Sequence, residues 1–111
     1  MTKITKVKLA RTTDEELLEE CKNEMQCGDC DITWINPPKG TRIQPPANTV
    51  VVVVDVPENK GAIRVFKTGT DKHLGTVGTE DAGYMVVVPW DNSWWFRVSG
   101  SLTVGYIVLA E

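Results

Sequence analysis

The chain has 111 residues, a length that suits one domain and leaves no room for two independent cores. Hydrophobic residues make up 41% and charged residues 24%, which is ordinary for a globular protein and excludes general disorder. The net charge of −3 and the absence of an apolar run of about 18 residues exclude a generally basic nucleic-acid-binding protein and a transmembrane helix. We therefore expect neither nucleic acid nor membrane as a partner.

Charge is unevenly distributed along the chain. Four cations and no acids occupy residues 1–11, eight acids against Lys22 alone occupy residues 12–31, and the remainder carries seven of each sign. A basic N-terminal arm could steer toward an acidic surface, but a solvated strand explains the pattern equally well. The N-terminus lacks the apolar run of a signal peptide, which predicts synthesis in the cytoplasm.

A strand and a helix are expected first along the chain. Residues 3–10 alternate imperfectly and carry lysine on both faces, as an edge strand or an extended arm would. Thr13 and Glu16 then form a capping-box pattern that predicts the start of a helix. Its apolar stripe is narrow and needs a cover, either from this domain or from a neighbour; the stripe consists of Leu17, Leu18, Cys21 and Met25. We expect an arm and helix over residues 1–30 and a β-sandwich domain over residues 31–111.

The remaining elements are expected to be short strands. Residues 31–35 predict a strand, and the pairs Pro37-Pro38 and Pro45-Pro46 then predict an extended loop or crossing arm that cannot sit inside a sheet. The valine run within residues 49–56 is typical of a strand buried on both faces. Further strands are expected at 62–67, 73–77, 84–88, 94–99 and 102–110. The sequence thus predicts a mainly β protein, an antiparallel β-sandwich or jelly roll with an N-terminal arm and one short helix.

The last two strands are expected to form a hairpin. Gly100-Ser101 has the glycine of a type II′ turn in its first position, which would place Trp95 opposite Tyr106 and Phe96 over Gly105. Trp94, Phe96 and Val98 would then point inward, because their face of the strand is wholly apolar.

Aromatic and polar residues near this predicted hairpin are the candidate binding residues. Trp95, Arg97 and Tyr106 would form a contact patch on the outer face, since Trp, Tyr and Arg are enriched at binding hot spots. The alternative is that Trp95 packs under the helix or a proline loop. Trp90, Asp91 and Asn92 are expected at a turn, where the tryptophan could stack on a sugar, insert into a neighbouring subunit or close the end of the sandwich.

Residue patterns typical of metal sites and catalysis are incomplete. Cys21, Cys27 and Cys30 lack the second pair of ligands of a zinc site, and the CxxC motif follows a helix instead of preceding one. With His73 as the single histidine, no Gly-x-Ser-x-Gly motif and no phosphate-binding loop, we expect no catalytic residues, no metal and no cofactor.

Four features together resemble a known family: a short leaderless chain, an early arm, a valine-rich core strand, and the glycine-punctuated segment from Phe96 to Tyr106. The chain resembles the small jelly-roll decoration or staple proteins of tailed bacteriophage capsids. The resemblance implies a non-enzymatic accessory subunit that binds the capsid surface of the virion at subunit junctions, with a larger capsid-type protein and further copies of itself as partners. The alternative is a carbohydrate-binding sandwich that stacks sugars on Trp90, Trp95 and Tyr106.

Overall fold

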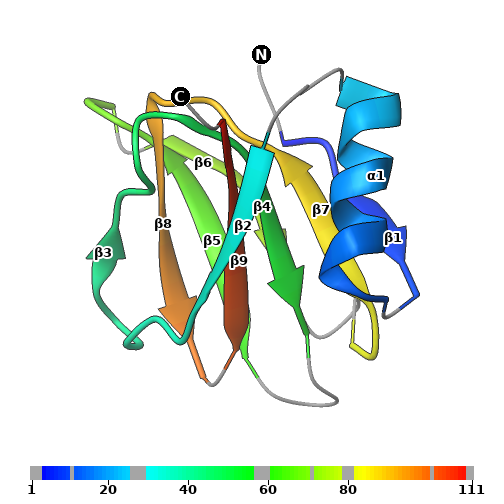
Figure 1. The fold of residues 1–111 in the computed structure, drawn as a ribbon. Coiled ribbons are helices and arrows are strands. Elements are labelled where there is room, and N and C mark those ends of the chain that lie inside the picture. Colours follow the sequence, from blue (N-terminus) through cyan, green and yellow to red (C-terminus); the bar gives the residue numbers. More distant parts are fainter. Residues whose placement is uncertain are drawn as a thin grey trace.

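The computed structural model describes residues 4–10, 12–25, 30–56, 61–70, 72–78, 82–100 and 102–109. In that part of the chain, two antiparallel sheets pack face to face around one core (Figure 1). The five-stranded sheet has the order β1 (Val7–Leu9), β7 (Met85–Pro89), β4 (Thr49–Asp55), β9 (Thr103–Leu109) and β2 (Cys30–Ile35). The four-stranded sheet has the order β3 (Arg42–Ile43), β8 (Trp94–Ser99), β5 (Ala62–Lys67) and β6 (Lys72–Val77).

The strand pairing follows a jelly roll. Strand β2 pairs with β9, β3 with β8, β4 with β7 and β5 with β6, so that the first half of the sandwich runs antiparallel to the second half. This is the connectivity of a long hairpin rolled into two sheets of four strands, to which β1 is added beside β7. The prediction of a mainly β sandwich of jelly-roll type is confirmed.

The position of strand β4 within its sheet accounts for the run of consecutive valines. The strand lies between β7 and β9, and Val51 to Val54 are all fully buried. Because side chains alternate along a strand, Val52 and Val54 point into the space between the sheets, while Val51 and Val53 point to the other face. That second face is covered by the helix, so both sides of the strand are apolar.

Helix α1 (Asp14–Met25) packs on the five-stranded sheet and is capped as the sequence predicts. The Glu16 N–H donates to Thr13 Oγ1 at 3.2 Å. Leu17 and Cys21 are buried against Val51, Val53 and Ile107, and Leu18 packs on the same cluster, so the domain itself covers this part of the apolar stripe. The indole N–H of Trp34 on β2 also donates to Asp14 Oδ1 at 2.9 Å, which ties the first turn of the helix to the sheet edge.

The N-terminal segment joins the two sheets along one side. The Ile4 N–H donates to the Leu74 carbonyl of β6, and Lys6 Nζ donates to the Thr76 carbonyl of the same strand. Strand β1 begins at the next residue, Val7, and pairs with β7 of the other sheet. The proposed division at residue 30 stays a prediction, but residues 4–10 and helix α1 pack on the sandwich.

The predicted hairpin at Gly100-Ser101 is wrong. Strand β8 pairs with β3 and β5, whereas β9 pairs with β2 and β4, so the chain crosses from one sheet to the other between them. Gly100 does have a positive φ of 90°, but such a glycine serves a turn between sheets as well as a turn within one. Ser101 lies outside the described residues. Gly105 is covered by Trp34 of β2, its partner across the strands, and not by Phe96.

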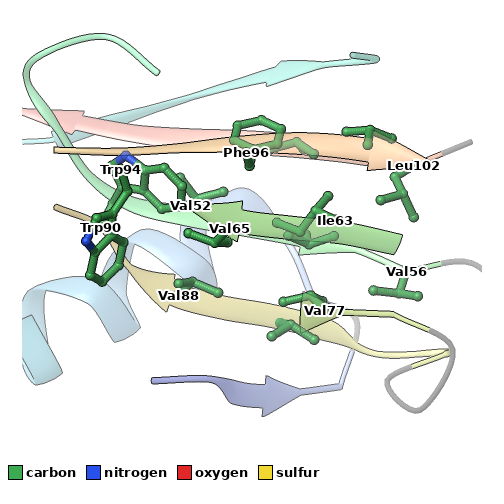
Figure 2. Close-up of a cluster of buried hydrophobic side chains, with 14 of the residues drawn as sticks. Val52, Val56, Ile63, Val65, Val77, Val88, Trp90, Trp94, Phe96 and Leu102 are labelled. Carbon is green, nitrogen blue, oxygen red and sulfur yellow. The ribbon is translucent and has the colours of Figure 1, made fainter. Parts of the chain in front are cut away.

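The main core fills the space between the sheets. Figure 2 shows Trp90 and Trp94 at one end of this cluster, Leu102 and Val56 at the other, and Phe96 between them. The Trp90 ring meets the Trp94 ring edge-to-face at 5.5 Å and the Phe96 ring at 5.9 Å. This arrangement suits the quadrupoles of the rings and fixes the inward face of β8.

Candidate docking surface

Adjacent tryptophans on β8 point to opposite sides of the four-stranded sheet. Trp94 belongs to the core between the sheets, together with Phe96 and Val98, as the sequence predicts. Trp95 therefore points to the outer face, as does Arg97 two residues further along. On the neighbouring strand β5, Ile63 and Val65 are core residues, which places Arg64 and Phe66 on the same outer face.

Trp95 is only 4% exposed although it lies on an outer face, because other side chains cover it. The Phe66 ring stacks on it with a centroid distance of 4.5 Å and an angle of 19°. The Arg42 guanidinium lies 4.4 Å from the centroid of the Trp95 ring, and that of Arg97 lies 5.5 Å from it. Arg42 belongs to β3, which lies between the two proline pairs. The contact of Arg42 with Trp95 therefore agrees in part with the alternative that Trp95 packs under a proline loop. The cation–π contacts hold two guanidinium groups against one ring.

Three arginines form a row across the four-stranded sheet. Arg42 lies directly opposite Arg97 on β8, which lies directly opposite Arg64 on β5. All three are exposed. The four strands of this sheet contain no aspartate or glutamate. Like charges placed directly opposite each other on a sheet repel, so the Arg42–Arg97 and Arg97–Arg64 pairs are unfavourable contacts within the sheet.

A shallow hollow lies beside the arginine row. Its volume is about 490 Å³, and it is lined by Lys39, Gly40, Arg64, Arg97, Val98, Ser99 and Gly100. Three of the lining side chains are cationic and none is acidic. The Gly40 N–H donates to the Val98 carbonyl at 2.8 Å, which fixes the loop that carries Lys39 next to β8. The hollow and the arginine row form one continuous cationic surface, because Arg64 and Arg97 belong to both.

Tyr106 does not lie on this surface, and its predicted position beside Trp95 is wrong. It lies on β9 of the other sheet, points into the core and is 7% exposed. Its ring is 6.4 Å from that of Phe96 in an edge-to-face arrangement. Burial raises the pKa of Tyr106 to about 12. The prediction failed because it assumed that β8 and β9 are neighbours, whereas they face each other across the core.

Trp90, Asp91 and Asn92 lie at one end of the sandwich, where the chain passes from β7 to β8 and so between the sheets. Trp90 is 9% exposed and packs in the core, which matches the third of its predicted roles. Asp91 Oδ1 accepts hydrogen bonds from the N–H and the hydroxyl of Ser93 at 2.8 and 2.7 Å. These bonds lower the pKa of Asp91, with burial opposing them and Lys67 adding a smaller favourable effect. Asn92 is exposed, and its carbonyl accepts a hydrogen bond from Gln44.

The six candidate residues therefore separate into three places. Trp95 and Arg97 share the outer face of the four-stranded sheet, Tyr106 lies in the core, and the remaining three lie at the end of the sandwich. Sequence reasoning missed Arg42, Arg64 and Lys39. The sequence did contain a pattern that points to them: the segments that form the four strands of this sheet hold five Lys and Arg residues and no Asp or Glu.

The described residues contain no metal site, and one further hollow lies on the other side of the sandwich. Cys21 and Cys30 are buried, Cys27 lies outside the described residues, and no group of three His, Cys, Asp or Glu side chains there could hold a metal ion. An apolar hollow of about 340 Å³ lies between α1 and the five-stranded sheet. No helix within the described ranges is long and apolar enough to cross a membrane.

Comparisons with models of protein families, with curated proteins and with solved structures found no match to this chain. The fold and the surface together define the class: a jelly-roll β-sandwich with a helix on one sheet and an exposed arginine row on the other.

Proposed function

We propose that the chain is a non-enzymatic assembly protein that docks on a larger protein through the outer face of its four-stranded sheet. The specific form of this proposal is a virion accessory subunit that stabilises a capsid at subunit junctions, as the resemblance to decoration proteins implies. In this form, the partners are a capsid-type shell protein and further copies of the chain, and the docking residues include Trp95 and Arg97.

One observation carries the proposal: the two sheets present very different outer faces. Helix α1 lies on the outer face of the five-stranded sheet (Figure 1). Its Leu17 and Cys21 pack against that face. On the opposite face, Trp95 contacts Phe66 and the guanidinium groups of Arg42 and Arg97, which are two of the three exposed arginines of the row. Arginine is among the residue types that contribute most at protein interfaces, and a guanidinium already held against an aromatic ring loses little side-chain entropy on binding.

The carbohydrate-binding alternative has less support. A sugar platform needs aromatic faces that are exposed together on one surface. Trp90 and Tyr106 are core residues, and Trp95 has its ring covered by Phe66 and Arg42. The three aromatic residues of that hypothesis therefore share no exposed surface.

Particle association tests the proposal. Intact particles from the cells that make this chain are separated on a density gradient, and the chain is quantified in each fraction by mass spectrometry. We expect a fixed ratio of the chain to the shell protein and antibody labelling on unopened particles. A chain that stays with the soluble proteins would overturn the proposal.

A matched pair of variants then tests the docking face. Arg97→Glu should be lost from the particles, because it reverses the central charge of the row. Lys22→Glu, which makes the same charge change on exposed helix α1, should remain bound. Equal retention of both variants would show that the chain docks through another face.

A further inference from the structure

We infer that the partner segment seated on this face is acidic, and that its carboxylates pair with Arg42, Arg97 and Arg64. This inference rests on the proposed docking function and names the chemistry of the partner. The arginine row is the observation that requires an explanation, because it combines three like charges in direct opposition with no acid on any strand of the sheet.

The first argument is energetic. Opposed like charges destabilise a sheet, and proteins normally relieve them with an acidic neighbour. The described residues contain no ion pair between these three arginines and a carboxylate. Sequences that break a local rule in this way do so mainly at functional sites. Among the described residues these arginines have no carboxylate partner, and a carboxylate of a bound protein would supply a countercharge and reduce the repulsion.

The second argument is geometric. Neighbouring strands lie about 4.8 Å apart, so the row places its arginines at roughly that spacing over about 10 Å. Glutamates three or four residues apart on a helix have Cβ atoms about 5–6 Å apart, which is a close match. A helix laid across β3, β8 and β5 would place one carboxylate near each arginine. Each guanidinium offers a planar fork of N–H donors that can take a carboxylate in a bidentate pair.

The third argument concerns preorganisation and the choice of ligand. The Trp95 ring holds the Arg42 and Arg97 guanidinium groups, so the cations are positioned before the partner arrives. The same contacts cover the Trp95 ring, which removes the stacking surface that a single-stranded nucleic acid would need. A row of fixed cations without free aromatic faces favours a carboxylate-bearing protein segment over nucleic acid. Lys39, at the edge of the hollow, extends the row by one further cation.

The test is a titration of the full chain with a helical probe peptide. The probe is alanine-rich, is roughly 20 residues long so that its helix is populated in water, and carries glutamates at intervals of four residues. Its control has glutamine at the same positions. We expect saturable binding of the glutamate peptide, weakened strongly by added salt, and no binding of the glutamine peptide.

Three variants locate the binding. Arg64→Glu and Arg97→Glu should each weaken binding about tenfold or more, because each replaces an attraction with a repulsion. Lys22→Glu makes the same charge change on α1 and should leave the affinity within about twofold. Arg64→Lys keeps the charge but loses the bidentate fork, so its affinity should lie between those of the parent and Arg64→Glu. Circular dichroism and thermal unfolding establish that each variant is folded.

Several results would overturn the inference. These are the absence of binding, equal weakening by Lys22→Glu, and tighter binding of single-stranded DNA or inorganic phosphate than of the peptide. Salt-sensitive self-association that Arg97→Glu abolishes would assign the face to a second copy of this chain. The two proposals can fail separately. Particle association without peptide binding would disprove only the inference that the partner segment is acidic. Peptide binding without particle association would disprove only the capsid role.

Discussion

At the scale of single residues, the arginines of the row repel one another in the folded chain, and we propose that the same charges attract the carboxylates of a partner. Arg64 is the clearest position to separate the two, because the structure gives it no contact with the Trp95 ring, unlike Arg42 and Arg97. It lies between Arg97 and Thr76 on the neighbouring strands. Replacing it therefore changes the charge repulsion without removing an aromatic contact.

We predict that Arg64→Thr leaves the fold as stable as the parent or more stable, by up to about 1 kcal/mol in the free energy of unfolding. Threonine favours strands and would lie opposite Thr76, while the repulsion with Arg97 disappears. Urea unfolding followed by circular dichroism measures the change. A loss of more than about 1 kcal/mol would contradict the view that the row is unfavourable for folding.

Tyr106 gives a pH-dependent prediction at the same scale. Its folded-state pKa of about 12 exceeds the ordinary value of 10.0, so the un-ionised side chain stabilises the fold fully below pH 10. This contribution is lost as the pH rises from about 10 to about 12, because the unfolded chain ionises first. The Tyr106→Phe variant has no hydroxyl to ionise at this position. Over that pH range its free energy of unfolding should therefore fall less than that of the parent, and the difference should be on the order of 2 kcal/mol. Parallel loss of stability in both proteins would contradict the assignment of Tyr106 to the core.

At the scale of elements, local patterns predict where strands and helices form but not which strands are neighbours. The valine run located β4, the alternation over residues 62–67 matches β5, and Thr13 with Glu16 marked the start of α1. Each of these depends on residues close together in the sequence. The neighbours of β8 and β9 depend on contacts with β3, β5, β2 and β4, which no local pattern contains. For this reason Trp95 was correctly placed on the outer face, while its assumed partner Tyr106 was not.

The contact of Trp34 on β2 with Gly105 on β9 and Asp14 on α1 gives a prediction at the scale of elements. A Cβ atom on Gly105 would lie 3.0 Å from two ring atoms of Trp34 and 3.1 Å from Ile32. Gly105→Ala should therefore displace the Trp34 ring, strain its hydrogen bond to Asp14 and lower stability by about 1–3 kcal/mol.

A double-mutant cycle identifies the cause of that loss. In a Trp34→Ala background the ring is absent, so Gly105→Ala should have a much smaller effect on the free energy of unfolding. Urea unfolding of the four proteins gives the coupling between the two positions. Equal effects of Gly105→Ala in both backgrounds would show that the Trp34 ring is not what requires glycine there.

At the scale of the whole molecule, charge is divided between the two sides of the sandwich. Helix α1 presents Asp14, Glu15, Glu16, Glu19 and Glu20 on the side of the five-stranded sheet. The other side presents the arginine row. Neither the net charge of −3 nor the balance of seven cations and seven acids over residues 32–111 reveals this division, because cations distant in the chain meet only in the folded sheet. The division favours one docking orientation over others through electrostatic steering.

The most direct test of the docking face is arginine-selective covalent labelling, read by mass spectrometry on the isolated chain and on the chain bound to particles. The account predicts that Arg42, Arg64 and Arg97 are labelled in the isolated chain and protected together in the bound chain. A parallel lysine-selective reagent should label Lys22 on helix α1 equally in both states. Unchanged labelling of the three arginines, with protection appearing at Lys22, would contradict the account.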